Sequence, residues 1–125
     1  ATDHAPHAAE EKDQPMTKAP FGIVGSETAF PLLYTHFVKN GDWTLQQLVD
    51  YLTIKPAETF DLPYGRLEEG ALADLAVINL DEEREIKAED FASKASNTPF
   101  LGYKVYGNPV LTMVEGEVKY KEEQL

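Results

Sequence analysis

Two amphipathic helical patterns in the first half of the chain present wide apolar faces, and no strand-like segment precedes them. Apolar residues recur at helical spacing over residues 30–38, which predicts a helix from near Thr28 to just before Gly41. Pro31 limits where this helix can begin, because proline is tolerated only in the first turn. An apolar helix face must be buried against another element. We therefore expect the chain to be a fragment of a larger protein.

The second helical pattern begins at Thr44. Thr44 and the residue three positions later have the spacing of a capping box. Pro56 ends this helix and is expected to open a short third helix that reaches Phe60. The predicted buried face of the second helix consists of Leu45, Leu48, Val49 and Leu52.

The pattern changes from helices to strands from Gly65 onward. Residues 73–80 form a short apolar run between charged turns, which predicts a strand. Residues 110–120 alternate around Glu115-Gly116, which predicts a hairpin. Residues 82–101 carry no clear period and are expected to form an irregular connection. The chain is thus α/β, with a helical first half and a β-rich second half.

The charge and the composition exclude several classes of partner and site. The net charge is −11, from 22 acidic and 11 basic residues, and such a surface repels phosphate backbones and anionic membranes. No apolar run approaches the roughly 20 residues of a membrane span. We expect neither a nucleic-acid nor a membrane partner. The absence of cysteine excludes disulfides and thiolate metal sites and is compatible with the cytosol.

Asp3, His4 and His7 form the densest group of chemically active residues, at the start of a long predicted loop over residues 1–25. Barrel enzymes place catalytic groups where a strand ends and a loop begins. An aspartate there can ligate zinc and accept a proton from water, and His7 could donate to an anionic substrate. The same residues also occur as solvated turn residues, so both interpretations stay open. Lys12, further along, could pair with a carboxylate or a phosphate, but an exposed loop lysine is the favoured interpretation.

Longer segments resemble a known family. Residues 1–7 (ATDHAPH), 10–12 (EEK) and 19–28 (APFGIVGSET) look like the C-terminal part of the bacterial dihydroorotases, which belong to the amidohydrolase superfamily. The agreement continues in order through residues 73–77 (ADLAV), 96–100 (SNTPF) and 107–110 (GNPV), and it covers essentially the whole chain. His7 together with Pro20-Phe21-Gly22 favours this family over the related hydantoinases and allantoinases, which share the Asp-His element.

The resemblance implies the C-terminal fragment of a metal-dependent (β/α)8 TIM barrel with part of an appended β-sandwich domain. Residues 1–62 would supply the end of the last barrel strand, the active-site loop and the terminal helices. Residues 63–125 would supply part of the small β-sandwich. The implied activity is the interconversion of N-carbamoyl-L-aspartate and L-dihydroorotate in de novo pyrimidine (UMP) synthesis, in the cytoplasm.

The resemblance also implies roles for individual residues. Asp3 matches an aspartate that ligates zinc and acts as general base and acid. His7 matches a histidine that holds the substrate carboxylate, and Phe21 and Gly22 match a loop segment whose backbone contacts the substrate. No role carries over to His4, which we expect to be structural. Two zinc ions are implied, whose remaining ligands lie outside this chain: a His-x-His pair, a modified lysine and two further histidines. The fragment alone is therefore expected to be inactive.

Alternative interpretations of the partners and of the function stay open at this point. The expected partners are a small-molecule substrate and either the rest of the enzyme or a second copy in a homodimer. One alternative function is another cyclic amidase, such as a hydantoinase or an allantoinase. Another is a catalytically dead homologue that acts as a scaffold, which would lack the His-x-His pair and the lysine.

Overall fold

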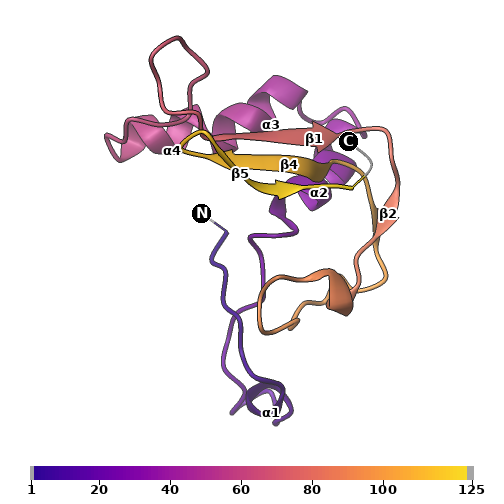
Figure 1. The fold of residues 1–125 in the computed structure, drawn as a ribbon. Coiled ribbons are helices and arrows are strands. Elements are labelled where there is room, and N and C mark those ends of the chain that lie inside the picture. Colours follow the sequence, from indigo (N-terminus) through magenta and orange to yellow (C-terminus); the bar gives the residue numbers. More distant parts are fainter. Residues whose placement is uncertain (1, 124–125) are drawn as a thin grey trace.

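The structure is a computed structural model that describes residues 2–123, and it shows a chain of mixed helices and strands (Figure 1). The helices, in chain order, are α1 (Ala9–Lys12), α2 (Ala29–Leu33), the π-helix η1 (Tyr34–Val38), α3 (Leu45–Leu52), α4 (Ile54–Thr59) and the 3₁₀ turn η2 (Ala88–Asp90). The strands are β1 (Leu75–Asn79), β2 (Arg84–Glu85), β3 (Lys104–Val105), β4 (Asn108–Val114) and β5 (Glu117–Lys121). None of the helices found within residues 2–123 is long and apolar enough to cross a membrane.

The first predicted helix begins and ends where the sequence indicated. Thr28 is its N-cap, and Pro31 occupies the first turn, where an amide has no helical partner to lose. The helix continues directly into η1. There the Lys39 amide donates to the Tyr34 carbonyl five residues back, which is the hydrogen bond of a π-helix. Gly41 lies just past the end, as predicted.

The capping box of α3 is confirmed, but its predicted buried face is only partly correct. The Gln47 amide donates to Thr44 Oγ1 at 3.1 Å, and the Thr44 amide donates to Gln47 Oε1 at 2.8 Å. Leu48 is fully buried, whereas Leu45 and Leu52 are 38% and 39% exposed. The two leucines lack a covering surface among the described residues, which is why the prediction fails for them.

The third helix, α4, starts two residues earlier than predicted. It begins at Ile54, so Pro56 lies inside its first turn rather than at the first position. Proline remains compatible with that position, since its missing N–H would have no helical partner there. Phe60 is the C-cap, so the predicted end of the helix is correct.

The strands form a three-stranded antiparallel sheet in the order β1-β4-β5 and a separate two-stranded ribbon of β2 and β3. The predicted hairpin is confirmed. Its turn residues Glu115 and Gly116 have φ values of +51° and +80°, as a two-residue turn with primed geometry requires. Most of residues 82–101 is irregular, as expected, apart from β2 and η2.

The helical and β-rich halves contact each other, and α2 and α3 lie behind the sheet in the view of Figure 1. Thr35 Oγ1 accepts a hydrogen bond from the Tyr106 amide at 2.8 Å and donates to the Tyr106 carbonyl at 3.4 Å. Gly107 lies so close to the helix that a Cβ atom there would be 2.9 Å from the Phe30 ring. The turn between β3 and β4 is thereby fastened to the helix.

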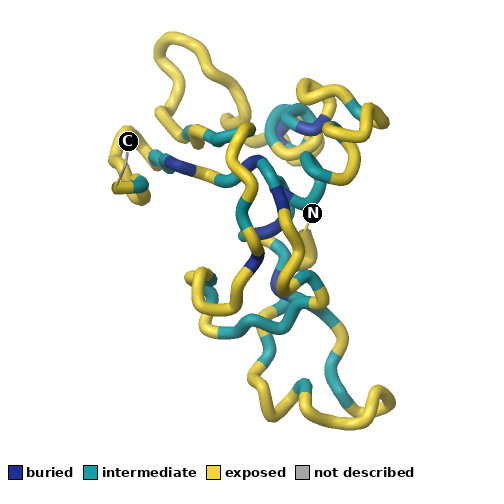
Figure 2. The backbone as a smooth tube through the Cα atoms, turned by 90° about the vertical axis from the view of Figure 1, so that its right-hand side faces the viewer, coloured by how far each residue is buried: buried dark blue, intermediate teal, exposed yellow. Residues whose placement is uncertain are grey.

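Few apolar side chains are buried within residues 2–123. Most of the backbone in Figure 2 accordingly has the colours of exposed or partly buried residues. The largest fully buried ones are Leu48, Val24 and Val105. Large apolar side chains such as Leu67 and Phe60 are 83% and 72% exposed. The apolar surface that the sequence indicated is therefore largely uncovered in this part of the structure.

Candidate functional site

Two short segments run side by side and frame the candidate site. His4 and Ile23 form a parallel bridge, and the Ala5 amide donates to the Ile23 carbonyl at 2.8 Å. The segments belong to an arm that extends away from the sheet and carries α1 near its tip (Figure 1). Residues 1–25 were predicted to be a loop, and the one-turn helix α1 is the exception.

Asp3 occupies an uncommon backbone conformation and has a solvent-exposed side chain. Its φ is +50°, in the left-handed region that aspartate adopts more readily than most residues. None of the hydrogen bonds and ion pairs found among residues 2–123 involves its carboxylate. Uncommon backbone conformations of this kind cluster at functional sites. Both carboxylate oxygens are thus available to a ligand.

The His4 ring is held by contacts within the chain through both of its nitrogens. Its Nδ1 atom accepts hydrogen bonds from the amides of Gly25 and Ser26, at 3.0 and 3.2 Å. These two donors assign the proton to Nε2, which donates to Ser93 Oγ at 3.3 Å. Because both ring nitrogens are engaged, His4 does not offer a lone pair to a metal ion.

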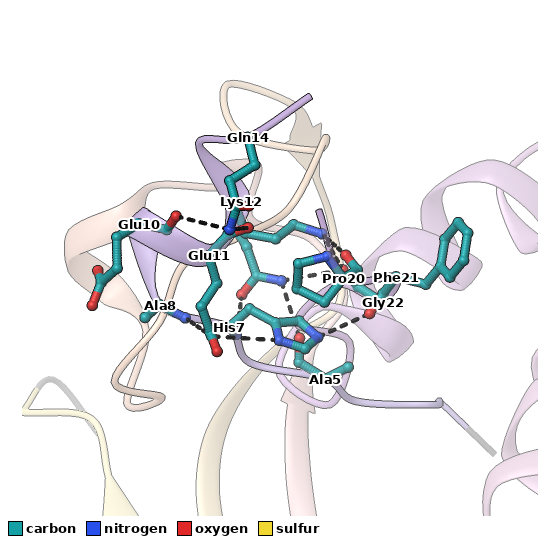
Figure 3. A network of polar contacts seen from close by, with 11 residues as sticks. Ala5, His7, Ala8, Glu10, Glu11, Lys12, Gln14, Pro20, Phe21 and Gly22 are labelled. Carbon is teal, nitrogen blue, oxygen red and sulfur yellow. Dashed lines mark hydrogen bonds and ion pairs between the residues drawn. The ribbon is translucent and has the colours of Figure 1, made fainter. Parts of the chain in front are cut away.

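His7, Phe21 and Gly22 lie together (Figure 3). The Nε2 atom of His7 donates to the Phe21 carbonyl at 2.8 Å, while Nδ1 lies 3.7 Å from a carboxylate oxygen of Glu11. The Phe21 ring is 93% exposed and points away from His7. Phe21 thus joins the cluster through its backbone. Asp3 belongs to the same segment as His7, but no hydrogen bond joins its carboxylate to the other three among the residues described.

Gly22 allows the two segments to approach each other. Its φ is +110°, and a Cβ atom there would lie 2.4 Å from the Ala5 Cβ and 3.4 Å from His7 Nε2. A contact of 2.4 Å between two carbon atoms is far inside van der Waals distance. The resemblance implies that the backbone of this glycine contacts the substrate. The structure shows a second reason for glycine at this position, because a side chain here would collide with Ala5.

Lys12 takes part in the cluster, which the sequence analysis did not foresee. Its ammonium group donates to the carbonyls of Pro20 and Gly22, at 2.9 and 3.0 Å (Figure 3). The expectation of an exposed loop lysine is wrong, because the chain folds back so that α1 faces these two carbonyls. Nothing in the local sequence around Lys12 indicates that return of the chain.

Asn97 is the second residue of the site that the sequence did not indicate. Its Nδ2 atom donates to the carbonyls of Ala5 and Gly22, at 3.0 and 3.2 Å. Its Oδ1 atom accepts from the His7 amide at 2.9 Å. Residues 96–100 supported the resemblance only as a matching segment. A contact across 90 positions of sequence leaves no local pattern from which it could have been inferred.

Glu27 fastens the same distant segment to the arm. Its carboxylate accepts hydrogen bonds from the amides of Ala92 and Ser93, at 2.8 and 3.0 Å. Burial raises the pKa of this carboxyl, but hydrogen bonds from the Ser93 side chain and from the two amides outweigh it and lower the pKa below its ordinary value. Glu27 is therefore a stable anion that holds residues 92–93 in place.

The described part of the chain does not by itself contain a complete metal site. Within residues 2–123, no three His, Asp or Glu side chains come together in an arrangement that could hold a metal ion. Catalytic zinc normally has three protein ligands and one open position. The unpartnered carboxylate of Asp3 fits a single ligand position, so any further ligands must come from outside the described residues.

Comparison with known proteins places this geometry in a family. Residues 1–119 match the Amidohydrolase family over most of the chain. The chain belongs to the amidohydrolase family. It is 78% identical over 124 residues to a dihydroorotase of Staphylococcus aureus (strain Mu50) and 72% identical over 124 residues to one of Staphylococcus epidermidis (strain RP62A). The match covers 99% of this chain and 29% of each relative, so the chain spans less than a third of their length.

Solved structures of amidohydrolases share the fold of this chain. An L-hydantoinase from Arthrobacter aurescens superposes with a TM-score of 0.88 at 37% identity, covering 96% of this chain and 28% of that chain. A dihydropyrimidinase from Brevibacillus agri gives a TM-score of 0.89 at 25% identity, covering 97% of this chain and 28% of that chain. The family and these neighbours imply that the chain is part of a TIM-barrel protein.

The contact between Gly22 and Ala5 generates a testable prediction. In the complete amidohydrolase, Gly22→Ala should separate the two segments and break the bond from the Ala5 amide to the Ile23 carbonyl. We expect the Ala5 amide to exchange with solvent roughly tenfold faster, since left-handed strain alone costs about 1–2 kcal/mol. Hydrogen–deuterium exchange measures this rate.

Gly70→Ala is the matched control. Gly70 also has a positive φ, +87°, but a Cβ atom there would meet nothing within 4 Å. The control variant should leave exchange at Ala5 unchanged. Equal exchange at Ala5 in the Gly22→Ala variant and the unmodified protein would show that the close approach is not maintained in solution.

Proposed function

We propose that the complete protein is a zinc-dependent dihydroorotase that interconverts N-carbamoyl-L-aspartate and L-dihydroorotate in pyrimidine synthesis. The observation that carries this proposal is the 78% identity to a staphylococcal dihydroorotase across 99% of this chain. The hydantoinase and dihydropyrimidinase neighbours are more distant, at 37% and 25% identity. The hydantoinase and the dihydropyrimidinase are thus relatives at the level of the family. The much higher identity to a dihydroorotase favours dihydroorotate as the substrate.

The proposal extends to the organisation of the complete enzyme. Residues 1–62 would complete the barrel, and residues 63–125 would contribute the β1-β4-β5 sheet to an appended β-sandwich. Two zinc ions would lie at the site, with Asp3 as the one ligand from this chain. We place the enzyme in the cytoplasm and expect a homodimer, or packing of this part against the rest of the enzyme.

Asp3 is the proposed catalytic base and acid. Zinc, when bound, lowers the pKa of the attacking water and polarises the amide carbonyl of the ring. In the hydrolytic direction, one carboxylate oxygen of Asp3 takes a proton from that water while the water oxygen attacks the carbonyl carbon of the ring. Asp3 then gives the same proton to the ring nitrogen as the C–N bond breaks. The exposed and unpartnered carboxylate supports this role, because no internal hydrogen bond has to be broken first.

His7 and the backbone of Phe21-Gly22 are the proposed substrate-binding groups. The Nε2–H group of His7 already donates to the Phe21 carbonyl at 2.8 Å. A substrate carboxylate would take over or share this donor, since a charged acceptor makes a stronger hydrogen bond than a carbonyl. Substrate binding and the position of Phe21 would thereby be coupled.

A substrate panel tests the proposed function directly. The complete protein, loaded with zinc, should hydrolyse dihydroorotate at least about a hundredfold faster, by kcat/KM, than hydantoin or allantoin, because a site that pairs the ring carboxylate penalises substrates without it. Preferred turnover of hydantoin or allantoin would instead make the protein another cyclic amidase. Absence of turnover on all three would favour the scaffold alternative.

The role of Asp3 predicts the effect of removing its carboxylate. In the complete enzyme, Asp3→Ala should lower kcat by at least about a thousandfold, because both proton transfers lose their carrier. Asp42→Asn, at another exposed aspartate, is the matched control and should retain full activity. Turnover is measured alongside the zinc content of each variant. Near-normal turnover of Asp3→Ala with zinc still bound would contradict the role.

The role of His7 predicts a change in KM rather than in kcat. His7→Ala should raise the KM for dihydroorotate by about 10- to 100-fold, the usual worth of a hydrogen bond to a charged group. His36→Ala, on the exposed face of η1, is the control and should leave KM unchanged. A lowered kcat with an unchanged KM would assign His7 to the chemical step instead of to substrate binding.

A further inference from the structure

We propose that Asn97 is a positioning residue, which sets the place of His7 and Gly22 by binding both segments of the site at once. The inference rests on the proposed function, because it assigns Asn97 to the substrate-binding groups of that reaction. Asn97 lies 90 positions from His7 in the sequence and reaches the arm from the irregular segment before β3.

The carboxamide of Asn97 takes the place of a neighbouring strand. Its Oδ1 atom accepts from the His7 amide at 2.9 Å, while its Nδ2 atom donates to the Ala5 carbonyl at 3.0 Å. An extended neighbouring backbone would offer the same acceptor and donor to positions i and i+2 of a strand. The residue between them, Pro6, has no amide hydrogen of its own, so this pairing captures the groups on either side of it.

The same residue also holds the second segment. Its Nδ2 atom donates to the Gly22 carbonyl at 3.2 Å, and its own backbone carbonyl accepts from the Val24 amide at 3.0 Å. The Gly22 carbonyl additionally accepts from the Lys12 ammonium at 3.0 Å. Asn97 therefore connects both proposed binding segments with three side-chain hydrogen bonds and one backbone hydrogen bond.

Only a carboxamide of this length satisfies all of these groups. An aspartate would accept from the His7 amide, but its anionic oxygen would face the carbonyl oxygens of Ala5 and Gly22. An alanine would remove these bonds from the His7 amide and the Ala5 carbonyl, and would leave the Gly22 carbonyl with the Lys12 ammonium as its remaining donor. Loss of these hydrogen bonds lets the two segments shift, and a misplacement of about 1 Å at a site lowers the rate by up to a hundredfold.

Kinetics of the complete zinc enzyme test the inference. We expect Asn97→Ala to raise the KM for dihydroorotate by about tenfold or more while zinc content stays unchanged. Asn97→Asp should be at least as impaired as Asn97→Ala. Asn40→Asp makes the same chemical change at the exposed end of η1 and should leave KM within about twofold. Normal KM values for both Asn97 variants would overturn the inference.

A double-mutant cycle separates positioning from a general structural effect. If Asn97 acts through His7, then Asn97→Ala should change KM much less in a His7→Ala enzyme than in the unmodified enzyme. Fully additive effects of the two substitutions would overturn the assignment, because they would show that Asn97 acts independently of His7.

Amide exchange keeps the inference testable even if dihydroorotate is not the substrate. Failure of the unmodified enzyme to turn over dihydroorotate would overturn the proposed function but not the positioning role of Asn97. In that case the His7 amide should still exchange roughly fivefold faster in Asn97→Ala than in the unmodified protein, since it loses the hydrogen bond that protects it. Unchanged exchange at His7 would overturn the positioning role itself.

Discussion

The hydrogen bonds from residues 92–97 to the N-terminal arm are the interaction on which the candidate site depends. Asn97 binds the segments of Ala5 and Gly22, Ser93 binds the His4 ring, and the Glu27 carboxylate holds the amides of residues 92–93. These contacts join the irregular connection of the β-rich half to the segments that carry Asp3 and His7. The site is thus assembled from both halves of the chain.

The arm is held by polar contacts because it buries little apolar surface. Val24 is its fully buried apolar side chain, at 1% exposure, whereas Met16 and Phe21 are 90% and 93% exposed. A single hydrogen bond contributes only about 1 kcal/mol, so no one of these contacts can hold the arm alone. Cooperation among Asn97, Lys12 and the residues around His4 is what gives the segments a defined arrangement.

Local elements of the fold were predictable where the signal is local. The helix start at Thr28, the capping box at Thr44 and the hairpin turn at Glu115-Gly116 depend on neighbouring residues, and all three are confirmed. The burial of Leu45 and Leu52 was predicted wrongly, because burial depends on what covers a helix face and not on its periodicity. The mixed order of helices and strands followed from the change of pattern near Gly65.

The sequence by itself determined which residues are candidates for chemistry: Asp3, His7 and the Phe21-Gly22 backbone, together with the structural assignment of His4. Residue type and spacing single out Asp3 and His7, whereas Phe21-Gly22 became candidates only through the resemblance to dihydroorotases. Only the tertiary structure decided that Lys12 and Asn97 belong with them, since these contacts depend on how the chain returns on itself. A hydrogen bond across 90 positions imposes no spacing on the sequence, so it becomes visible only when the segments are placed in space.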